Sequence, residues 1–163
     1  MDSWGASGWT NDQGWSVHRG GDFVLYPVSP TRGMFEFAAL KRHGKRIRWV
    51  LRYKDPRNYL LFEIDGKTFS RKEVDNGRII GPVEVVHGTS EAAFTLQIEV
   101  HPESITHRIY TKGAWKTVED WRQPGQDFDS GSFGFLLGKD DEIGLSNFRF
   151  VSEPPVVSTA KPK

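Results

Sequence analysis

The sequence contains no cysteine, and this absence excludes two kinds of site. Without thiols the chain has no disulfide framework and no thiolate ligand for a metal ion. Many bacterial proteins lack cysteine whatever their compartment, so this absence leaves the localisation open.

Long apolar runs and an excess of one charge are missing as well. No stretch reaches about 18 consecutive apolar residues, which excludes a transmembrane helix. The first residues, Met1 to Gly5, show neither the basic nor the apolar region of a secretory signal peptide. The 22 basic and 21 acidic residues nearly cancel, so no strong field draws the protein to nucleic acid or to an anionic membrane. We therefore expect neither nucleic-acid binding nor direct membrane insertion.

Aromatic residues are abundant, and apolar and polar side chains alternate along much of the chain. Six Trp and eleven Phe raise the aromatic content to 13%, enough to fill a core. In residues 46–53, Ile47, Trp49 and Leu51 alternate mainly with arginine. Successive side chains of a strand point to opposite faces, so this period of two is typical of a half-buried antiparallel strand. The same alternation recurs at residues 35–38, 96–101, 105–110, 133–137 and 148–150.

Turn signals separate these segments at short intervals. Asp65-Gly66 and Asn76-Gly77 supply the positive φ that tight hairpin turns require. No stretch predicts a long amphipathic helix, although residues 70–74 or 90–93 suit a single helical turn. The pattern predicts about eleven or twelve strands in an all-β fold, a two-sheet antiparallel jelly-roll sandwich.

A chain of 163 residues suits one domain, which we place at residues 1–153. Residues 4–14, rich in Gly, Ser and Trp, predict an irregular lead-in whose tryptophans anchor it to the domain. Residues 154–163 (PPVVSTAKPK) have the Pro, Ser, Thr and Lys composition of an extended linker. We therefore expect this domain to be tethered to other domains of a longer chain.

Residues 48–65 (RWVLRYKDPRNYLLFEID), 95–121 and 131–151 (GSFGFLLGKDDEIGLSNFRFV) cover most of the predicted domain. The three segments resemble the paired central strands, a hairpin and the closing strands of the concanavalin A-like lectin/glucanase superfamily. The likeness is to laminin G-like jelly rolls found as ancillary modules in bacteria. It implies a module of a larger bacterial protein and favours an extracytoplasmic or secreted location. The superfamily contains lectins, polysaccharide-binding modules, glycosidases and protein-binding modules, so the fold does not fix the function.

The glucanases of this superfamily place their catalytic carboxylates in an E-x-D-x-x-E strand motif. Glu63 and Asp65 match its opening, but Thr68 stands where the second Glu belongs, and Asp65 also belongs to a predicted hairpin turn. The acid/base of such a glycosidase is therefore missing, and we expect no catalytic residue. His101 and His107 are close in sequence and conceivable as a metal pair, but ordinary polar positions at a hairpin are the favoured interpretation.

The loop at residues 138–142 is acidic, and calcium prefers six to eight oxygen ligands, usually on loops. The resemblance implies a structural Ca²⁺ held between this loop and an N-terminal loop that carries Asp22 or Asn11-Asp12. An ordinary acidic turn is the alternative, because Lys139 lies among the carboxylates. The predicted metal ligands are Asp140, Asp141, Glu142 and Asp22.

Polar positions of the predicted strands supply a candidate ligand face. Sugars offer C–H bonds to aromatic rings, and their hydroxyls bond to planar groups such as Arg, Glu and Gln. Alternating Arg and Glu also form cross-strand ion pairs in sheets that bind nothing. The predicted ligand-binding residues are Arg48, Arg52, Glu63, Gln97, Glu99, Arg108, Tyr110 and Trp115.

The leading hypothesis from the sequence is a non-catalytic module that binds a glycan or polysaccharide. The alternative is a protein-interaction or structural laminin G-like module, and a hydrolase of sugar derivatives is the third. An exposed Trp or Tyr beside Arg48 and Arg52 would favour carbohydrate, whereas a salt-bridged face without rings would favour the alternative.

Overall fold

A computed structural model of the chain describes residues 4–5, 8–44, 46–85 and 87–153, so the predicted tail at 154–163 lies outside the described residues. These residues include no helix long and apolar enough to cross a membrane. The strands are β1 (Thr10–Asp12), β2 (Trp15–Arg19), β3 (Asp22–Leu25), β4 (Gly33–His43), β5 (Arg46–Asp55), β6 (Asn58–Asp65), β7 (Thr68–Asp75), β8 (Arg78–Val85), β9 (Ala93–His101), β10 (Ser104–Thr111), β11 (Ala114–Arg122), β12 (Ser132–Leu137) and β13 (Glu142–Ser152).

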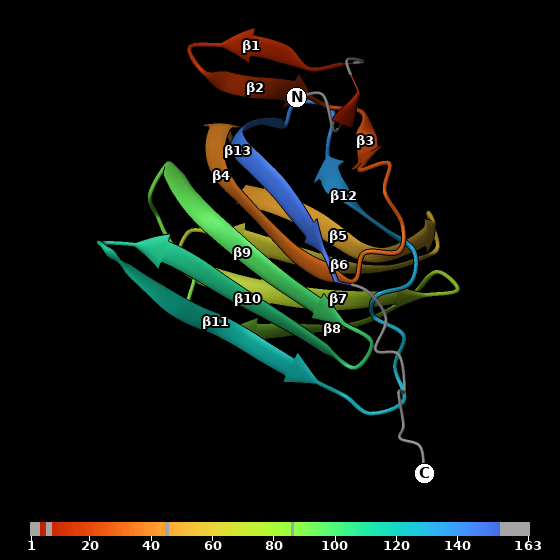
Figure 1. Ribbon diagram of the computed structural model, residues 1–163. Helices are drawn as coiled ribbons and strands as arrows, with labels where there is room; N and C mark the ends of the chain where they lie inside the picture. Colours follow the sequence, from red (N-terminus) through yellow and green to blue (C-terminus); the bar gives the residue numbers. More distant parts are fainter. Residues whose placement is uncertain (1–3, 6–7, 45, 86, 154–163) are drawn as a thin grey trace.

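Two antiparallel sheets lie face to face and form a sandwich (Figure 1). The seven-stranded sheet has the order β1-β2-β13-β4-β9-β10-β11, and the six-stranded sheet has the order β3-β12-β5-β6-β7-β8. This arrangement confirms the predicted all-β, two-sheet antiparallel jelly-roll sandwich. Asp65-Gly66 is the β6–β7 turn, as predicted, with Asp65 paired to Thr68.

Two local predictions are wrong. Residues 70–74 form part of strand β7 and no helical turn, because they pair with β6 and β8 on both sides. The described part of the chain has thirteen strands, more than the eleven or twelve expected. One of them lies in the predicted lead-in, where Thr10–Asp12 pairs with β2 as a short edge strand.

The aromatic residues fill the space between the sheets, as the alternation predicts. Phe35 is fully buried and stacks on Phe133 and on Phe150, with ring centroids 4.3 Å apart in both pairs. Trp49 is also fully buried. Trp4, from the lead-in, is buried against the core and confirms the predicted anchoring role for this tryptophan.

His107 is a titratable residue inside this core. The indole Nε1 of Trp49 donates a hydrogen bond of 3.0 Å to His107 Nε2, and the rings of Phe62 and Phe69 lie 4.6 and 5.1 Å away. His101 points elsewhere and lies 3.0 Å from a Glu153 carboxylate oxygen. The two histidines therefore form no metal pair.

Candidate functional site

An irregular stretch of β5 carries Arg52 to one end of the sandwich. β5 and β6 pair regularly from Arg46 to Leu51, and the pairing resumes only at Asp55 opposite Asn58. Residues 52–54 therefore bulge, and Arg52 takes a φ of 50°, which residues other than glycine seldom adopt. Bulges turn side chains away from the regular sheet direction and are frequent next to binding sites.

The loop between β11 and β12 forms the opposite wall. Its Gly131 has a φ of 75° and lies so close to the bulge that a Cβ atom there would be 2.7 Å from the Tyr53 carbonyl oxygen. Ser29 Oγ donates a hydrogen bond of 2.8 Å to the Gly131 carbonyl and ties the loop to the domain. This close packing brings Gln126 and Asp127 to the Arg52 side chain.

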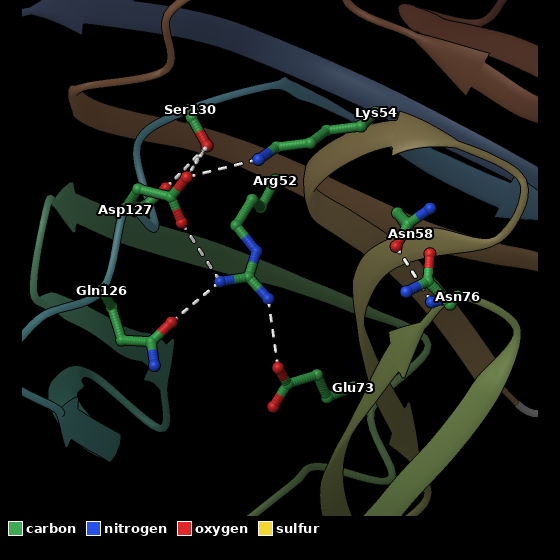
Figure 2. Close-up of polar contacts among 8 residues, drawn as sticks. All are labelled: Arg52, Lys54, Asn58, Glu73, Asn76, Gln126, Asp127 and Ser130. Atoms are coloured by element: carbon green, nitrogen blue, oxygen red, sulfur yellow. Dashed lines mark hydrogen bonds and ion pairs between the residues drawn. The ribbon is translucent and has the colours of Figure 1, made fainter.

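The Arg52 guanidinium joins three segments of the chain (Figure 2). Its Nη1 donates to Gln126 Oε1 at 2.9 Å and to Asp127 Oδ1 at 3.3 Å. Its Nη2 donates to Glu73 Oε2, on β7, at 3.2 Å. Because the Arg52 side chain is only 14% exposed, these contacts hold it in one orientation.

Asp127 is the carboxylate with most partners in this group. Lys54 Nζ lies 3.2 Å from Asp127 Oδ2, and Ser130 Oγ donates to the same oxygen at 3.0 Å (Figure 2). Burial alone would raise the pKa of Asp127, but the hydrogen bonds from Ser130 and Lys54 and the charges of Lys54 and Arg52 outweigh it. The pKa lies below its usual value, so this carboxylate is ionised at neutral pH.

These groups border a cavity of about 300 Å³, which we call the rim pocket. Asn58 is fixed in it, since its Oδ1 accepts a hydrogen bond from the Asn76 amide at 2.9 Å (Figure 2). The second carboxylate oxygen of Glu73 and the whole carboxylate of Asp75 have no hydrogen-bond or ion-pair partner in the described chain, so both are available to a ligand. The pocket is lined by Arg52, Lys54, Asn58, Tyr59, Glu73, Val74, Asp75 and Asp127.

An aromatic wall adjoins the charged groups. The half-buried Tyr59 ring lies 5.1 Å from the ring of Phe23 and 6.0 Å from that of Tyr53. Phe23 and Tyr53 are themselves in contact at 4.7 Å. The rim pocket thus combines planar polar groups with a ring that is held in place by its neighbours.

The structure divides the eight predicted ligand-binding residues between the two sheets. Arg48, Arg52 and Glu63 belong to the six-stranded sheet. Gln97, Glu99, Arg108, Tyr110 and Trp115 belong to the seven-stranded sheet. Of these three, Arg52 lines the rim pocket. Arg48 Nη2 forms an ion pair with Asp141 Oδ2 at 3.3 Å, and Glu63 Oε1 lies 4.0 Å from Arg46 Nη1.

On the seven-stranded sheet the predicted residues bond mostly to one another. Arg108 Nη1 donates to Gln97 Oε1 and to Glu99 Oε1, both at 3.0 Å. Burial alone would raise the pKa of Glu99, but hydrogen bonds from Arg108 and His101 lower it below its usual value. This is the cross-strand pairing that the sequence also allowed. Tyr110 and Trp115 lie apart from it at the β10–β11 hairpin, with rings 5.3 Å apart and both more than 40% exposed.

Sequence reasoning missed Tyr59, Glu73, Gln126 and Asp127. Glu73 lies in residues 70–74, which suited a helical turn in the sequence, and residues 122–130 were assigned to no strand or motif. The stretch from Gln126 to Ser130 before strand β12 is polar apart from Phe128, and it was a usable signal for a binding loop, because loops carry function more often than strands do. The sequence does not show that this loop lies against Arg52 on β5, because that contact depends on the tertiary fold.

Three of the four predicted calcium ligands have partners within the protein. Asp141 Oδ2 accepts hydrogen bonds from Arg48 at 3.3 Å and from the Gly138 amide at 2.8 Å. Asp140 and Glu142 form ion pairs. Asp140 Oδ1 lies 3.7 Å from Arg19 Nη2, and Glu142 Oε1 lies 3.6 Å from Arg42 Nε. Within the described ranges no three His, Cys, Asp or Glu side chains form a group that could hold a metal ion. Calcium binding by Asp140, Asp141, Glu142 and Asp22 stays a prediction without geometric support.

No family model matches the sequence, and no curated protein matches it. Several solved structures share the fold. The carbohydrate-binding module CBM66 from Bacillus subtilis matches 86% of this chain and 88% of its own with a TM-score of 0.63 and 19% identity. Sheep galectin-11 matches 81% of this chain and 98% of its own with a TM-score of 0.57 and 10% identity.

A larger protein with a matching part is the GH43 protein BlXynB from Bacillus licheniformis. It matches 90% of this chain with a TM-score of 0.64 and 13% identity, but the chain spans only 35% of that protein's length. At identities this low the likenesses establish the fold alone, a two-sheet jelly-roll sandwich.

Proposed function

We propose that this domain is a non-catalytic carbohydrate-binding module of the concanavalin A-like type, and that the rim pocket is its binding site. The observation that carries this proposal is a single cavity in which the Arg52 guanidinium, the carboxylates of Glu73 and Asp75 and the ring of Tyr59 meet. Sugar hydroxyls bond to such planar charged groups, and sugar C–H bonds pack on aromatic rings. The likeness to CBM66 and to a galectin supports the same ligand class.

The size of the rim pocket suits a small part of a glycan. Ligand cavities in proteins range from about 300 to 1,000 Å³, and the rim pocket lies at the lower end of this range. Its lining carries two cationic and three anionic side chains, so the net charge of the lining is 2 − 3 = −1. A neutral sugar fits this balance better than an acidic one, because the carboxylates repel a negative group.

A binding role without catalysis is supported by the pKa of one pocket carboxylate, Asp127. A glycosidase acid needs a raised pKa so that it carries a proton at working pH. The pKa of Asp127 is lowered instead. Thr68, in place of the second motif Glu, pairs with Asp65 at the β6–β7 turn.

We also propose that the domain is one module of a longer protein. The composition of residues 154–163 supports this, and so does the match to about a third of the length of a GH43 protein. In such a protein the module would hold its partner domain close to a polysaccharide.

The test is binding of the purified domain to an array of glycans and polysaccharides, followed by titration of any hit against two variants. Arg52→Ala removes the guanidinium from the rim pocket. Arg46→Ala is the matched control, because it removes the same charge from the same strand at a 43% exposed side chain outside the pocket. Loss of a charged hydrogen-bonding group predicts about 10- to 100-fold weaker binding for Arg52→Ala and little change for Arg46→Ala.

A blank array from a domain shown to be folded by its cooperative unfolding would overturn the proposal. The protein-interaction alternative would then lead, and the exposed side chains of Ile79, Ile80 and Val83 on edge strand β8 favour it. A hit that survives Arg52→Ala but is lost in Trp115→Ala would contradict the rim pocket and place the site at the β10–β11 hairpin.

A further inference from the structure

A second cavity lies at the opposite end of the sandwich from the rim pocket. β6 begins at Asn58, in the rim pocket, and ends at Asp65, next to the turn that carries Lys67 into the second cavity. This cavity has a volume of about 460 Å³, and we call it the basic pocket. Its lining residues are Lys67, Gly88, Thr89, Ser90, Glu91, Thr111, Lys112 and Lys116.

The basic pocket gathers three lysines from separate parts of the chain. Lys67 is on the β6–β7 turn, Lys112 is on the β10–β11 turn, and Lys116 is on β11. None of the three has an ion pair or a side-chain hydrogen bond within the described residues. Glu91 is the one carboxylate of the described lining, and its Oε1 accepts a hydrogen bond from Thr111 Oγ1 at 2.8 Å. The net charge of the described lining is therefore 3 − 1 = +2, opposite in sign to the net charge of the rim pocket.

The backbone around the basic pocket is tightly held. Gly88 donates a hydrogen bond of 2.8 Å to the Lys67 carbonyl, and a Cβ atom on Gly88 would lie 2.6 Å from the Gly66 carbonyl oxygen. The Thr89 carbonyl accepts from Lys41 Nζ at 2.8 Å, and Thr89 is buried. A wall fixed in this way loses little conformational entropy when a ligand binds.

The hairpin that supplies two of the lysines also carries the exposed aromatic pair. Tyr110 and Trp115 are 42% and 44% exposed, and Trp115 directly precedes Lys116. A ring packs against sugar C–H bonds, whereas lysine ammonium groups bind anions as point charges. Successive residues of a strand point to opposite faces, so Lys116 faces the basic pocket, whereas Trp115 and its cross-strand partner Tyr110 face the outer side of the seven-stranded sheet and do not line the pocket.

We propose that the basic pocket is a second ligand site, which binds the carboxylate or sulfate groups of an acidic polysaccharide. Three ammonium groups gathered without anionic partners repel one another, and a bound anion removes that repulsion. The choice of a polysaccharide rests on the proposed carbohydrate function. The preference for an anion rests on the lysines alone.

The experiment measures binding of the whole domain to polygalacturonate, to dextran sulfate and to neutral dextran. One variant, Lys67→Gln/Lys112→Gln/Lys116→Gln, removes the three pocket charges. Its control, Lys72→Gln/Arg78→Gln/Lys139→Gln, removes three charges that also lack partners among the described residues but lie outside the pocket. We expect binding to at least one acidic polymer, about tenfold or more weaker in the pocket variant and within about twofold of the parent in the control.

Binding should also weaken as salt rises from about 0.05 to about 0.5 M, since salt screens exposed charges. Binding to polygalacturonate alone identifies a carboxylate, and binding to dextran sulfate alone identifies a sulfate. Equal losses in the two triple variants, or binding to neither acidic polymer above dextran, would overturn the proposal. Arg52→Ala should leave this binding intact, so failure of the rim pocket as a sugar site and failure of the basic pocket give different results.

Discussion

At the scale of single residues, His107 shows how the core controls protonation. Burial, together with the positive charge of Arg71, lowers the pKa of His107 to about 3. The pKa of histidine in an unfolded chain is about 6.5. Between this pH and about 3, His107 is protonated in the unfolded chain but stays neutral in the folded chain. The stability that comes from a neutral His107 is therefore fully present above pH 6.5 and is lost as the pH falls toward 3.

We expect His107→Gln to flatten the acid dependence of stability. Glutamine offers Trp49 Nε1 an acceptor in place of His107 Nε2 but does not titrate. Between pH 7.5 and 4.5, the histidine accounts for a loss of about 2–3 kcal/mol in the free energy of unfolding. Urea unfolding at both pH values measures this loss. The same loss in the parent and the variant would contradict the assignment to His107.

Single positions also mark the limit of prediction from the sequence. Trp49 alternates with Ile47 and Leu51, so its burial followed from period two and is confirmed. Arg48 and Arg52 share the opposite phase but have different surroundings, because the bulge after Leu51 redirects only Arg52. Alternation assigns a face to a side chain only as long as the pairing stays regular.

At the scale of elements, the contact between the β5 bulge and the β11–β12 loop decides the shape of the rim pocket. Gly131→Ala would place a methyl group 2.7 Å from the Tyr53 carbonyl oxygen, where rigid backbone must shift. Gly125→Ala is the matched control, because Gly125 lies in the same loop with a φ of 83° but has nothing within 4 Å of the added atom.

Both substitutions put alanine at a positive φ, so each should lower the free energy of unfolding by about 1 kcal/mol for that reason. Gly131→Ala should lose about 1–3 kcal/mol more and should also weaken glycan binding, because the shifted loop carries Gln126 and Asp127 away from Arg52. Urea unfolding and titration with the array hit measure the two effects. If Gly125→Ala weakened glycan binding as much, the close contact at Gly131 would not be the cause.

Most elements were predictable and their irregularities were not. Alternation identifies segments of β4, β5, β9 and β10, because that signal is local. The bulge at residues 52–54 is packed against Gly131, which is more than 70 residues further along the chain, and no local pattern encodes that contact. Strand β1 was missed for a similar reason, since its three residues depend on pairing with β2.

At the scale of the whole molecule, a sandwich has two outer faces, and this limited the prediction of the site. The polar phase of a strand shows that a side chain points outward, but it does not show from which sheet. Arg48 and Arg108 were assigned to one ligand face, whereas the fold places them on different sheets. The rim pocket and the basic pocket lie at the two ends of the sandwich instead, where turns and loops meet.

The last prediction follows from this separation. β6 is 8 residues long and spans about 25 Å between the two pockets, far beyond the distance of about 10 Å within which substitutions usually couple. We therefore expect Arg52→Ala to weaken binding of the neutral array hit and the triple pocket variant Lys67→Gln/Lys112→Gln/Lys116→Gln to weaken binding of the acidic polymer, each without affecting the other ligand.

Calorimetric titration of both ligands into the parent, the two variants and their combination measures this independence. For each ligand the losses should add within about 0.5 kcal/mol. A larger deviation would mean that one ligand contacts both ends of the sandwich, or that the sheets transmit a change from one end to the other. With additive losses, the two ends are separate sites of opposite local charge, so one domain can hold a neutral and an acidic part of a polysaccharide at once.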